Sequence, residues 1–244
     1  MRSRLLPPDQ RGRWARAATR GKELALVAFV ALGIAGVLWA VLDPVHGGLA
    51  TLLAAFALVA GGFAWLEQGG DTARDITLVA TLGGIAAAGR VLFAPIPNVQ
   101  PVTVIVAAAG VALGPRRGFA VGALAAIASN MFLGQGPHTP WQMLAWGGCG
   151  VLAGVFGFAL RRRWPFALFC AVLGMAFGTV MDLWLWFAFY PHTWAAFATV
   201  LVGGVAFNVA HAFGNLVLAL AAGPELRRVL DRHGRSVHTE VVWT

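Results

Sequence analysis

Long apolar runs recur along the chain, and they constrain its fold more than any other feature. Several of them reach the roughly 18 residues that a helix needs to cross a bilayer. Of the 244 residues, 59% are hydrophobic and 11% are charged, whereas charged residues make up about a quarter of a soluble domain. The sequence therefore predicts an all-α integral membrane protein.

Eight transmembrane helices are predicted, at 23–42, 47–66, 75–93, 101–114, 118–133, 141–160, 165–189 and 195–222. If the N-terminus lies in the cytoplasm, every Lys and Arg lies on the inner side, except Arg90 within the third span. Positively charged loops are retained on the cytoplasmic side of a membrane. We therefore expect a multi-pass protein of the bacterial cell membrane with both termini cytoplasmic. The net charge of +8 then reflects topology, and no nucleic-acid partner is expected.

The predicted spans divide the chain into four segments. Residues 1–22 form a basic cytoplasmic N-terminus, 23–66 an accessory two-helix pair, 75–223 a six-helix core and 224–244 a cytoplasmic tail. The first two spans contain few polar side chains, and the glycine-containing acidic segment 67–75 that follows them is expected to be a flexible linker.

Small residues recur every four positions in the third span, at Ala80, Gly84 and Ala88. Helices in lipid associate through such stripes, because small side chains allow two backbones to approach closely. Composition alone favours packing against a neighbouring helix of the same chain. The alternative is a docking face for a separate membrane protein.

Two predicted outside loops, 94–101 and 134–142, are rich in proline and amide side chains. Apolar walls with a few convergent polar groups are typical of small-molecule sites, so we expect these loops to cover one. Trp and Tyr also form interfacial belts without a ligand role, which accounts for Trp184 and Trp194. The candidate ligand-binding residues are Arg90, Asn98, Gln100, Asn130, Gln135, His138, Trp141, Gln142, Asp182, Trp186 and Tyr190.

Ionisable residues inside spans face a cavity or a partner, because a charge in lipid is costly. Arg90 and Asp182 both lie near the outer side, and they either pair with each other or contact a ligand. His211 shares a helical face with Asn208 and Asn215. We interpret it as a neutral histidine in a polar seam between helices rather than as a proton relay.

Enzyme and cofactor motifs are absent from the sequence. It contains no P-loop, no G-x-S-x-G and no H-E-x-x-H motif. His46, His138 and His192 lack the spacing of metal ligands, so no metal and no cofactor are expected. Cys149 and Cys170 both lie in apolar runs, and no disulfide is indicated.

Four segments of the chain resemble the substrate-binding S components of energy-coupling factor (ECF) transporters. They read IPNVQPVT, GVALGPRRGFAVGAL, ASNMFLGQGPHTPWQMLAWG and GTVMDLWLW, and the resemblance covers residues 75–222. It implies six core helices, a vitamin or related micronutrient bound from outside, and docking on a transmembrane coupling protein driven by two cytoplasmic ATPases. It also implies docking through small residues four apart on the first core helix, which favours the docking role for Ala80, Gly84 and Ala88.

The predicted function is therefore that of a substrate-specific transport subunit of an ECF-type ABC importer, without enzymatic activity of its own. The alternative is an integral membrane enzyme acting on a lipid or isoprenoid, and a third class is a purely structural membrane subunit. No cluster of basic residues marks the outer side, which argues against a multiply anionic ligand. A neutral, partly apolar, ring-containing micronutrient fits better, and the resemblance favours cobalamin or a precursor.

Overall fold

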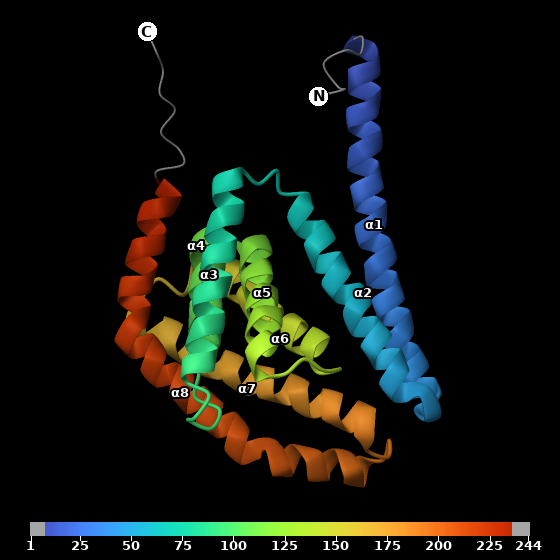
Figure 1. Ribbon diagram of the computed structural model, residues 1–244, viewed down its shortest axis with the longest axis vertical. Coiled ribbons are helices and arrows are strands. Elements are labelled where there is room, and N and C mark those ends of the chain that lie inside the picture. The colour runs from blue at the N-terminus through green and yellow to red at the C-terminus, as the bar shows by residue number, and fades with distance from the viewer. Residues whose placement is uncertain (1–7, 236–244) are drawn as a thin grey trace.

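The computed structural model describes residues 8–235, apart from the side chains of residues 8–20, Pro44 and residues 231–235. These residues form the predicted all-helical fold (Figure 1). Its elements are α1 (Pro8–Leu42), the short 3-10 turn η2 (Pro44–His46), α2 (Gly47–Glu67), α3 (Ala73–Leu92), α4 (Val102–Leu113), α5 (Pro115–Leu133), α6 (Thr139–Val155), α7 (Arg163–Phe189) and α8 (Trp194–Arg235).

Five helical segments are long and apolar enough to cross a membrane: Gly21–Leu42, α2, α3, α7 and Trp194–Leu230. The short helix α4 has 12 residues, so it rises only about 18 Å, less than the roughly 30 Å of a hydrocarbon core. Residues 102–110 of α4 are buried. Neighbouring helices rather than lipid therefore surround this helix, and it forms the centre of the bundle.

Local sequence sets the helix boundaries close to the predicted ones. Thr72 and Asp75 form a capping box at the start of α3, which satisfies two backbone N–H groups that the helix leaves unpaired. Gly114 and Gly134 have φ angles of 89° and 104°, a conformation that a residue without Cβ adopts at little cost. These two glycines end α4 and α5.

The two ends of the chain are more helical than the sequence indicated. Helix α1 begins at Pro8, within the segment predicted as a basic N-terminus, and α8 continues through Pro224 to Arg235, into the predicted tail. Contacts with the α6–α7 turn hold this part of α8. Arg227 donates to the backbone oxygen of Leu160 over 2.6 Å, and Leu230 is buried.

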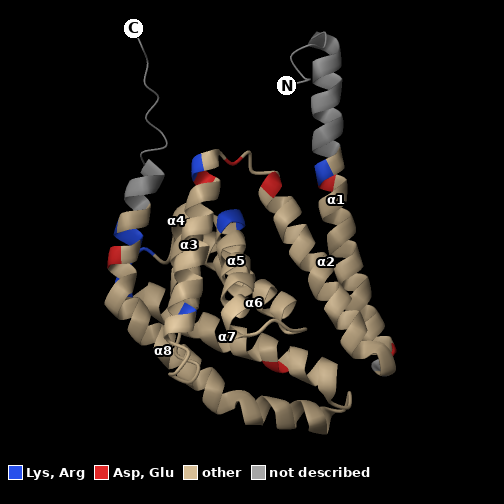
Figure 2. Ribbon diagram, viewed as in Figure 1, with Lys and Arg blue, Asp and Glu red and all other residues tan. Residues whose placement is uncertain are grey.

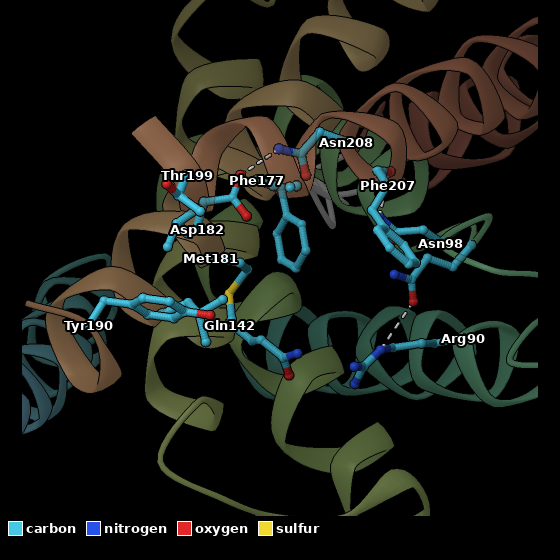
Figure 3. A pocket seen from close by; sticks show the side chains of 16 residues that line it. Arg90, Asn98, Gln142, Phe177, Met181, Asp182, Tyr190, Thr199, Phe207 and Asn208 are labelled. Atoms are coloured by element: carbon cyan, nitrogen blue, oxygen red, sulfur yellow. Dashed lines mark hydrogen bonds between the residues drawn. The ribbon is translucent and has the colours of Figure 1, made fainter. Parts of the chain in front are cut away.

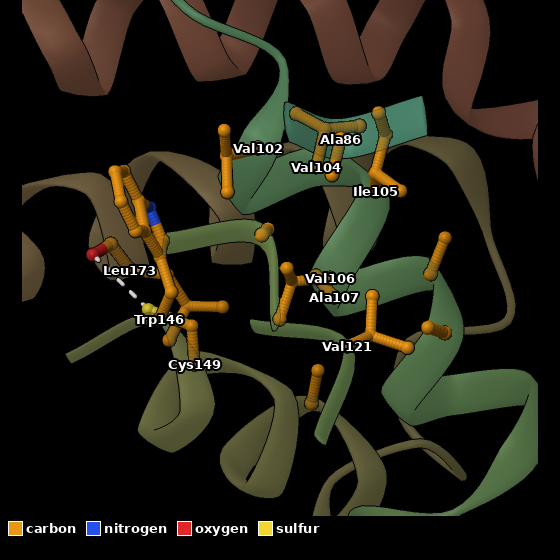
Figure 4. Close-up of a cluster of buried hydrophobic side chains, with 14 of the residues drawn as sticks. Ala86, Val102, Val104, Ile105, Val106, Ala107, Val121, Trp146, Cys149 and Leu173 are labelled. Atoms are coloured by element: carbon orange, nitrogen blue, oxygen red, sulfur yellow. Dashed lines mark hydrogen bonds between the residues drawn. The ribbon is translucent and has the colours of Figure 1, made fainter. Parts of the chain in front are cut away.

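Buried apolar side chains of α4, α5 and α6, among them Val106, Val121 and Trp146, pack together at the centre of the bundle (Figure 4). Glycine contacts bring these three helices close to one another. A Cβ built on Gly150 would overlap the carbonyl group of Gly118, and one built on Gly118 would lie 2.8 Å from the Cα of Gly110. The backbones of the three helices therefore touch, as small residues permit in a membrane. Trp146 is fully buried beside this contact, stacked on Phe177 with ring centres 4.3 Å apart.

The first two helices attach to the remaining six through α2. Helix α1 packs against α2, whereas α2 also contacts α5, α6 and α7. The segment expected to be a flexible linker is instead held in place. Arg117 of α5 pairs with Asp71 at 2.7 Å and with Asp75 at 3.1 Å.

Charged residues are concentrated at one end of the bundle, where α2 meets α3 (Figure 2). Arg90 is the exception among the described basic residues, since it lies near the opposite end of α3. The distribution agrees with the charge asymmetry of the predicted topology.

Candidate functional site

Polar side chains inserted against glycines join α7 to α8 and shape the space between them. A Cβ on Gly178 would collide with the amide of Asn208, and one on Gly204 would lie 2.5 Å from either carboxylate oxygen of Asp182. The glycines therefore make room for polar groups that face the interior. This arrangement keeps Asp182 and Asn208 close together, with Asn208 Nδ2 donating to Asp182 Oδ2 over 2.7 Å.

A cavity of about 630 Å³ lies beside this contact, at the end of the bundle opposite the charged loops (Figure 3). Its volume falls within the ~300–1,000 Å³ that small-molecule sites occupy. The cavity is lined by Arg90, Asn98, Gln100, Gln142, Phe177, Gly178, Met181, Asp182, Leu185, Tyr190, Thr199, Val200, Gly203, Gly204, Phe207 and Asn208.

Arg90 extends from the last turn of α3 into a polar pocket of the core. Its Nε donates to Gln100 Oε1 over 3.1 Å, and its Nη1 donates to Ser129 Oγ over 2.7 Å and to Asn130 Oδ1. The guanidinium carbon lies 4.9 Å from the ring centre of Trp146, a cation–π contact. Because these contacts replace water, they make a charge at this depth tolerable.

Asn130 supports Arg90 from beneath the cavity rather than lining it. Its Nδ2 donates to Gln142 Oε1 over 2.8 Å and to Thr139 Oγ1 over 2.9 Å. Asn130 itself is 1% exposed. Its amide therefore orients both Arg90 and Gln142.

Arg90 and Asp182 line the same cavity but do not pair. Among the residues that the structure describes, Arg90 forms no ion pair with any carboxylate, and neither does Asp182 with any basic group. The partner of Asp182 is Asn208. Of the two alternatives that the sequence left open, pairing between Arg90 and Asp182 is therefore not observed. Both charged groups remain next to the cavity.

The loop 94–101 is fastened to α8 by Asn98. This residue has a φ angle of 56°, a left-handed conformation that asparagine tolerates better than most residues. Its Nδ2 donates to the backbone oxygen of Phe207 over 2.6 Å, and its own carbonyl lies 2.9 Å from His211 Nδ1. The first of the two loops therefore contributes Asn98 and Gln100 to the cavity wall.

His211 lies in a buried polar seam that runs from this loop into the core. Its Nε2 is 3.1 Å from Thr103 Oγ1, which accepts a hydrogen bond from Trp146 Nε1 over 3.2 Å. Since Nδ1 faces the carbonyl of Asn98, Nδ1 carries the proton and Nε2 accepts from Thr103. A neutral histidine satisfies every one of these contacts.

The second loop, 134–142, contributes only Gln142 to the cavity wall. Gln135 instead donates to the backbone oxygen of Ile127, and Trp141 lies in α6 with its Nε1 buried and without a partner among the described residues. His138 packs edge-on against Trp184, with ring centres 5.9 Å apart. Burial lowers the pKa of His138, and the charge of Arg90 acts in the same direction.

Trp186 also lies outside the cavity wall, because its ring packs against Phe197 and its Nε1 donates to the backbone oxygen of Pro191. Of the predicted ligand-binding residues, the structure thus brings Arg90, Asn98, Gln100, Gln142, Asp182 and Tyr190 to one cavity. Asn130, Gln135, His138, Trp141 and Trp186 surround it or lie elsewhere.

The apolar wall of the cavity was missed by the sequence reasoning. It consists of Phe177, Met181, Leu185, Val200 and Phe207. These residues lie in apolar spans, where side chains that face lipid and side chains that face a cavity are of the same types. The sequence therefore does not distinguish the two. Asn208 could have been recognised as a cavity residue, because it is a polar side chain within a predicted span. Its spacing in the sequence indicated only the polar seam around His211.

The small-residue stripe of α3 faces away from the bundle. Ala80, Gly84 and Ala88 are all exposed, and a Cβ on Gly84 would meet nothing within 4 Å. Residues of the same helix that face inward include Val79, Leu82 and Ala86. Packing within the chain therefore does not account for the stripe.

No metal centre is present among the described residues, since no three His, Cys, Asp or Glu side chains gather there. His46 is bound to Asp43 at 2.7 Å, and His192 Nε2 lies 3.2 Å from the backbone oxygen of Phe187. The hydrogen bond between His46 and Asp43 lowers the pKa of Asp43.

Comparison with known families gives one match. The model described as "ECF transporter, substrate-specific component" matches residues 74–222, which contain α3 to α7 and most of α8. Comparison with the curated proteins and with the solved structures found no match.

Proposed function

We infer the function of this chain from one premise: it belongs to the family of ECF transporter substrate-specific components. As such a component, it is a membrane subunit of an importer and not an enzyme. We propose that it binds a vitamin or a related micronutrient from outside the cell and delivers it for ATP-driven uptake. The observation that carries this proposal is the cavity of about 630 Å³, which the loop 94–101 lines through Asn98 and Gln100.

For the architecture we propose that residues 75–223 form the substrate-binding unit and 23–66 an accessory pair. Support comes from the packing, since α1 contacts the rest of the chain through α2 and the short turn η2. The family match begins at residue 74, where the accessory pair has ended.

For the partners we propose a transmembrane coupling protein and two cytoplasmic ATPases. Ala80, Gly84 and Ala88 would contact the coupling protein. This proposal is supported by their exposure on α3 and by the close backbone approach that such stripes allow.

For the orientation we propose that the charged end lies in the cytoplasm and the cavity faces outward. A single cysteine at Asn98 or His138 is then expected to react with a membrane-impermeant maleimide in intact cells, whereas one at Arg117 or Arg162 reacts only after permeabilisation. The native Cys149 and Cys170 are buried, so they give a low background. Labelling at Arg117 in intact cells would reverse both the orientation and the side of the cavity.

For the ligand we propose a ring-containing micronutrient that packs against Phe177, Met181 and Phe207. Cobalamin or a precursor is the candidate that the sequence favoured. A corrinoid is larger than most ligands of a cavity of this volume, so it requires the loop 94–101 to open around it. A compact vitamin fits inside the cavity without such a change.

Growth of a vitamin auxotroph tests the proposal directly. A strain that lacks its own uptake system and expresses this chain with the coupling protein and ATPases is expected to grow on nanomolar vitamin. Strains requiring cobalamin, biotin, thiamine, riboflavin or pantothenate are compared in parallel. Rescue of another strain, without rescue of the cobalamin strain, would exclude cobalamin as the ligand, and rescue of none would contradict uptake of these vitamins.

A further inference from the structure

At the Arg90 end of the cavity, Arg90, Gln100 and Gln142 present free hydrogen-bond donors. Arg90 uses Nε and Nη1 for its contacts within the chain, and the two N–H groups of Nη2 have no partner among the described residues. The oxygen of Gln100 accepts from Arg90, and the oxygen of Gln142 accepts from Asn130. The Nε2 groups of both glutamines are therefore left for a ligand.

This orientation of the two amides is set by their partners. A glutamine oxygen accepts and its nitrogen only donates, so neither Gln100 nor Gln142 can turn its oxygen to the cavity without losing a hydrogen bond. Gln142 is 9% exposed and lines the cavity. Figure 3 shows the ends of Arg90 and Gln142 pointing toward each other across one side of the cavity.

The opposite side of the cavity presents an acceptor. Asp182 Oδ2 is bound by Asn208, but Oδ1 has no partner in the part of the chain that the structure describes. In Figure 3 the carboxylate of Asp182 lies across the cavity from Arg90, with the ring of Phe177 between them. The cavity thus has a cationic donor end, an apolar middle and an anionic acceptor end.

We propose that the ligand is a compact carboxylate whose acid group binds Arg90, Gln100 and Gln142 and whose far end carries an N–H or O–H donor for Asp182. This inference rests on the proposed uptake function and deepens it by naming the substrate class, which the carboxylate and the distal donor define whether or not the ligand contains a ring. The carboxylate of such a ligand supplies the counter-ion that Arg90 lacks among the described residues, and the far end supplies a hydrogen bond to Asp182. A ligand without a carboxylate leaves Arg90 desolvated and uncompensated, which is costly at this depth.

Binding to the purified full chain in lipid nanodiscs tests the ligand class by equilibrium dialysis. The probes are two carboxylates with distal donors, biotin and pantothenate, and their neutral counterparts biotinol and pantothenol. Thiamine, riboflavin and cyanocobalamin complete the set. We expect one carboxylate to bind most tightly and its neutral counterpart to bind about tenfold or more weakly, the effect of losing a charged hydrogen bond.

Two isosteric variants assign the two ends. Gln100→Glu keeps an acceptor for Arg90 Nε but replaces a free donor with a carboxylate oxygen, so binding of the carboxylate probe is expected to fall about tenfold or more. Binding of its neutral counterpart is expected to change little. Asp182→Asn is expected to weaken binding of both the carboxylate probe and its neutral counterpart, because the two probes carry the same distal donor.

Gln68→Glu is the matched control, since Gln68 lies in the segment between α2 and α3 and bonds the backbone of Lys22. It is expected to leave all probes unaffected. If the tightest probe has no carboxylate, or if Gln100→Glu affects both members of the pair equally, the assigned ligand class is wrong while the uptake function stands. If no probe binds, the uptake function proposed above is contradicted as well.

Discussion

Replacing Gly84 by leucine is expected to abolish uptake while leaving ligand binding by the purified chain intact. A side chain at this position meets nothing within 4 Å, so the bundle itself accommodates it. The new side chain would occupy the space that a partner helix needs for close approach. Overpacking costs about 1–3 kcal/mol, and association with the coupling protein should fall about 5- to 150-fold. Uptake of labelled vitamin and co-purification of the coupling protein measure the two effects.

Ala176→Leu is the control for added bulk on the surface of the helical bundle. Ala176 is also exposed, but on α7, so uptake is expected to persist in this variant. Loss of ligand binding by Gly84→Leu with intact association would assign the stripe to the interior of the bundle. Equal uptake in both variants would show that α3 does not dock through Gly84.

The fold could be predicted from the sequence because membrane helices carry strong local signals. Apolar length marks each span, and glycines such as Gly114 and Gly134 mark where helices end through their positive φ angles. The ends of the chain were harder to predict. Polarity does not distinguish a free tail from a helix held by contacts such as that of Arg227 with Leu160, which depend on tertiary structure.

The candidate site could be predicted only where polar residues stand out against an apolar background. Arg90 and Asp182 were recognisable because a charged side chain within a span is costly unless it faces a cavity or a partner. Both line the cavity. Trp141 and Trp186 resemble ligand-stacking residues in sequence but pack elsewhere. An aromatic residue near a membrane interface can bind a ligand, anchor the helix at the interface or pack against other helices. The sequence does not distinguish these roles, whereas the packing in the structure does.

The orientation of the Gln100 and Gln142 side-chain amides could not be predicted from the sequence. Which end of Gln100 or Gln142 faces the cavity depends on hydrogen bonds from Arg90 and Asn130, which lie in other structural elements than the glutamines they bind. The chemical asymmetry of the cavity is thus a property of the folded network. Sequence composition alone suggested a largely neutral aromatic and amide site.

The second large effect is expected from Gly150→Val, which should prevent the chain from folding. A Cβ at Gly150 would overlap the carbonyl group of Gly118, and a backbone cannot move aside as a flexible side chain does. The cost should reach or exceed the upper end of the ~1–3 kcal/mol typical of overpacking. Fluorescence-detected size-exclusion chromatography of the detergent-solubilised protein is expected to show aggregate in place of the monodisperse peak.

Gly148→Val separates this steric effect from the general cost of valine in a helix. Gly148 lies in the same helix, α6, but a Cβ there meets nothing within 4 Å. Valine has a higher helix propensity than glycine, so this variant is expected to fold, with a melting temperature close to that of the parent chain. If both variants gave the same monodisperse peak and melting temperature, α5 and α6 would not be in backbone contact. The placement of Trp146 and of the Arg90 network above that contact would then be wrong too, because both depend on how closely these helices approach.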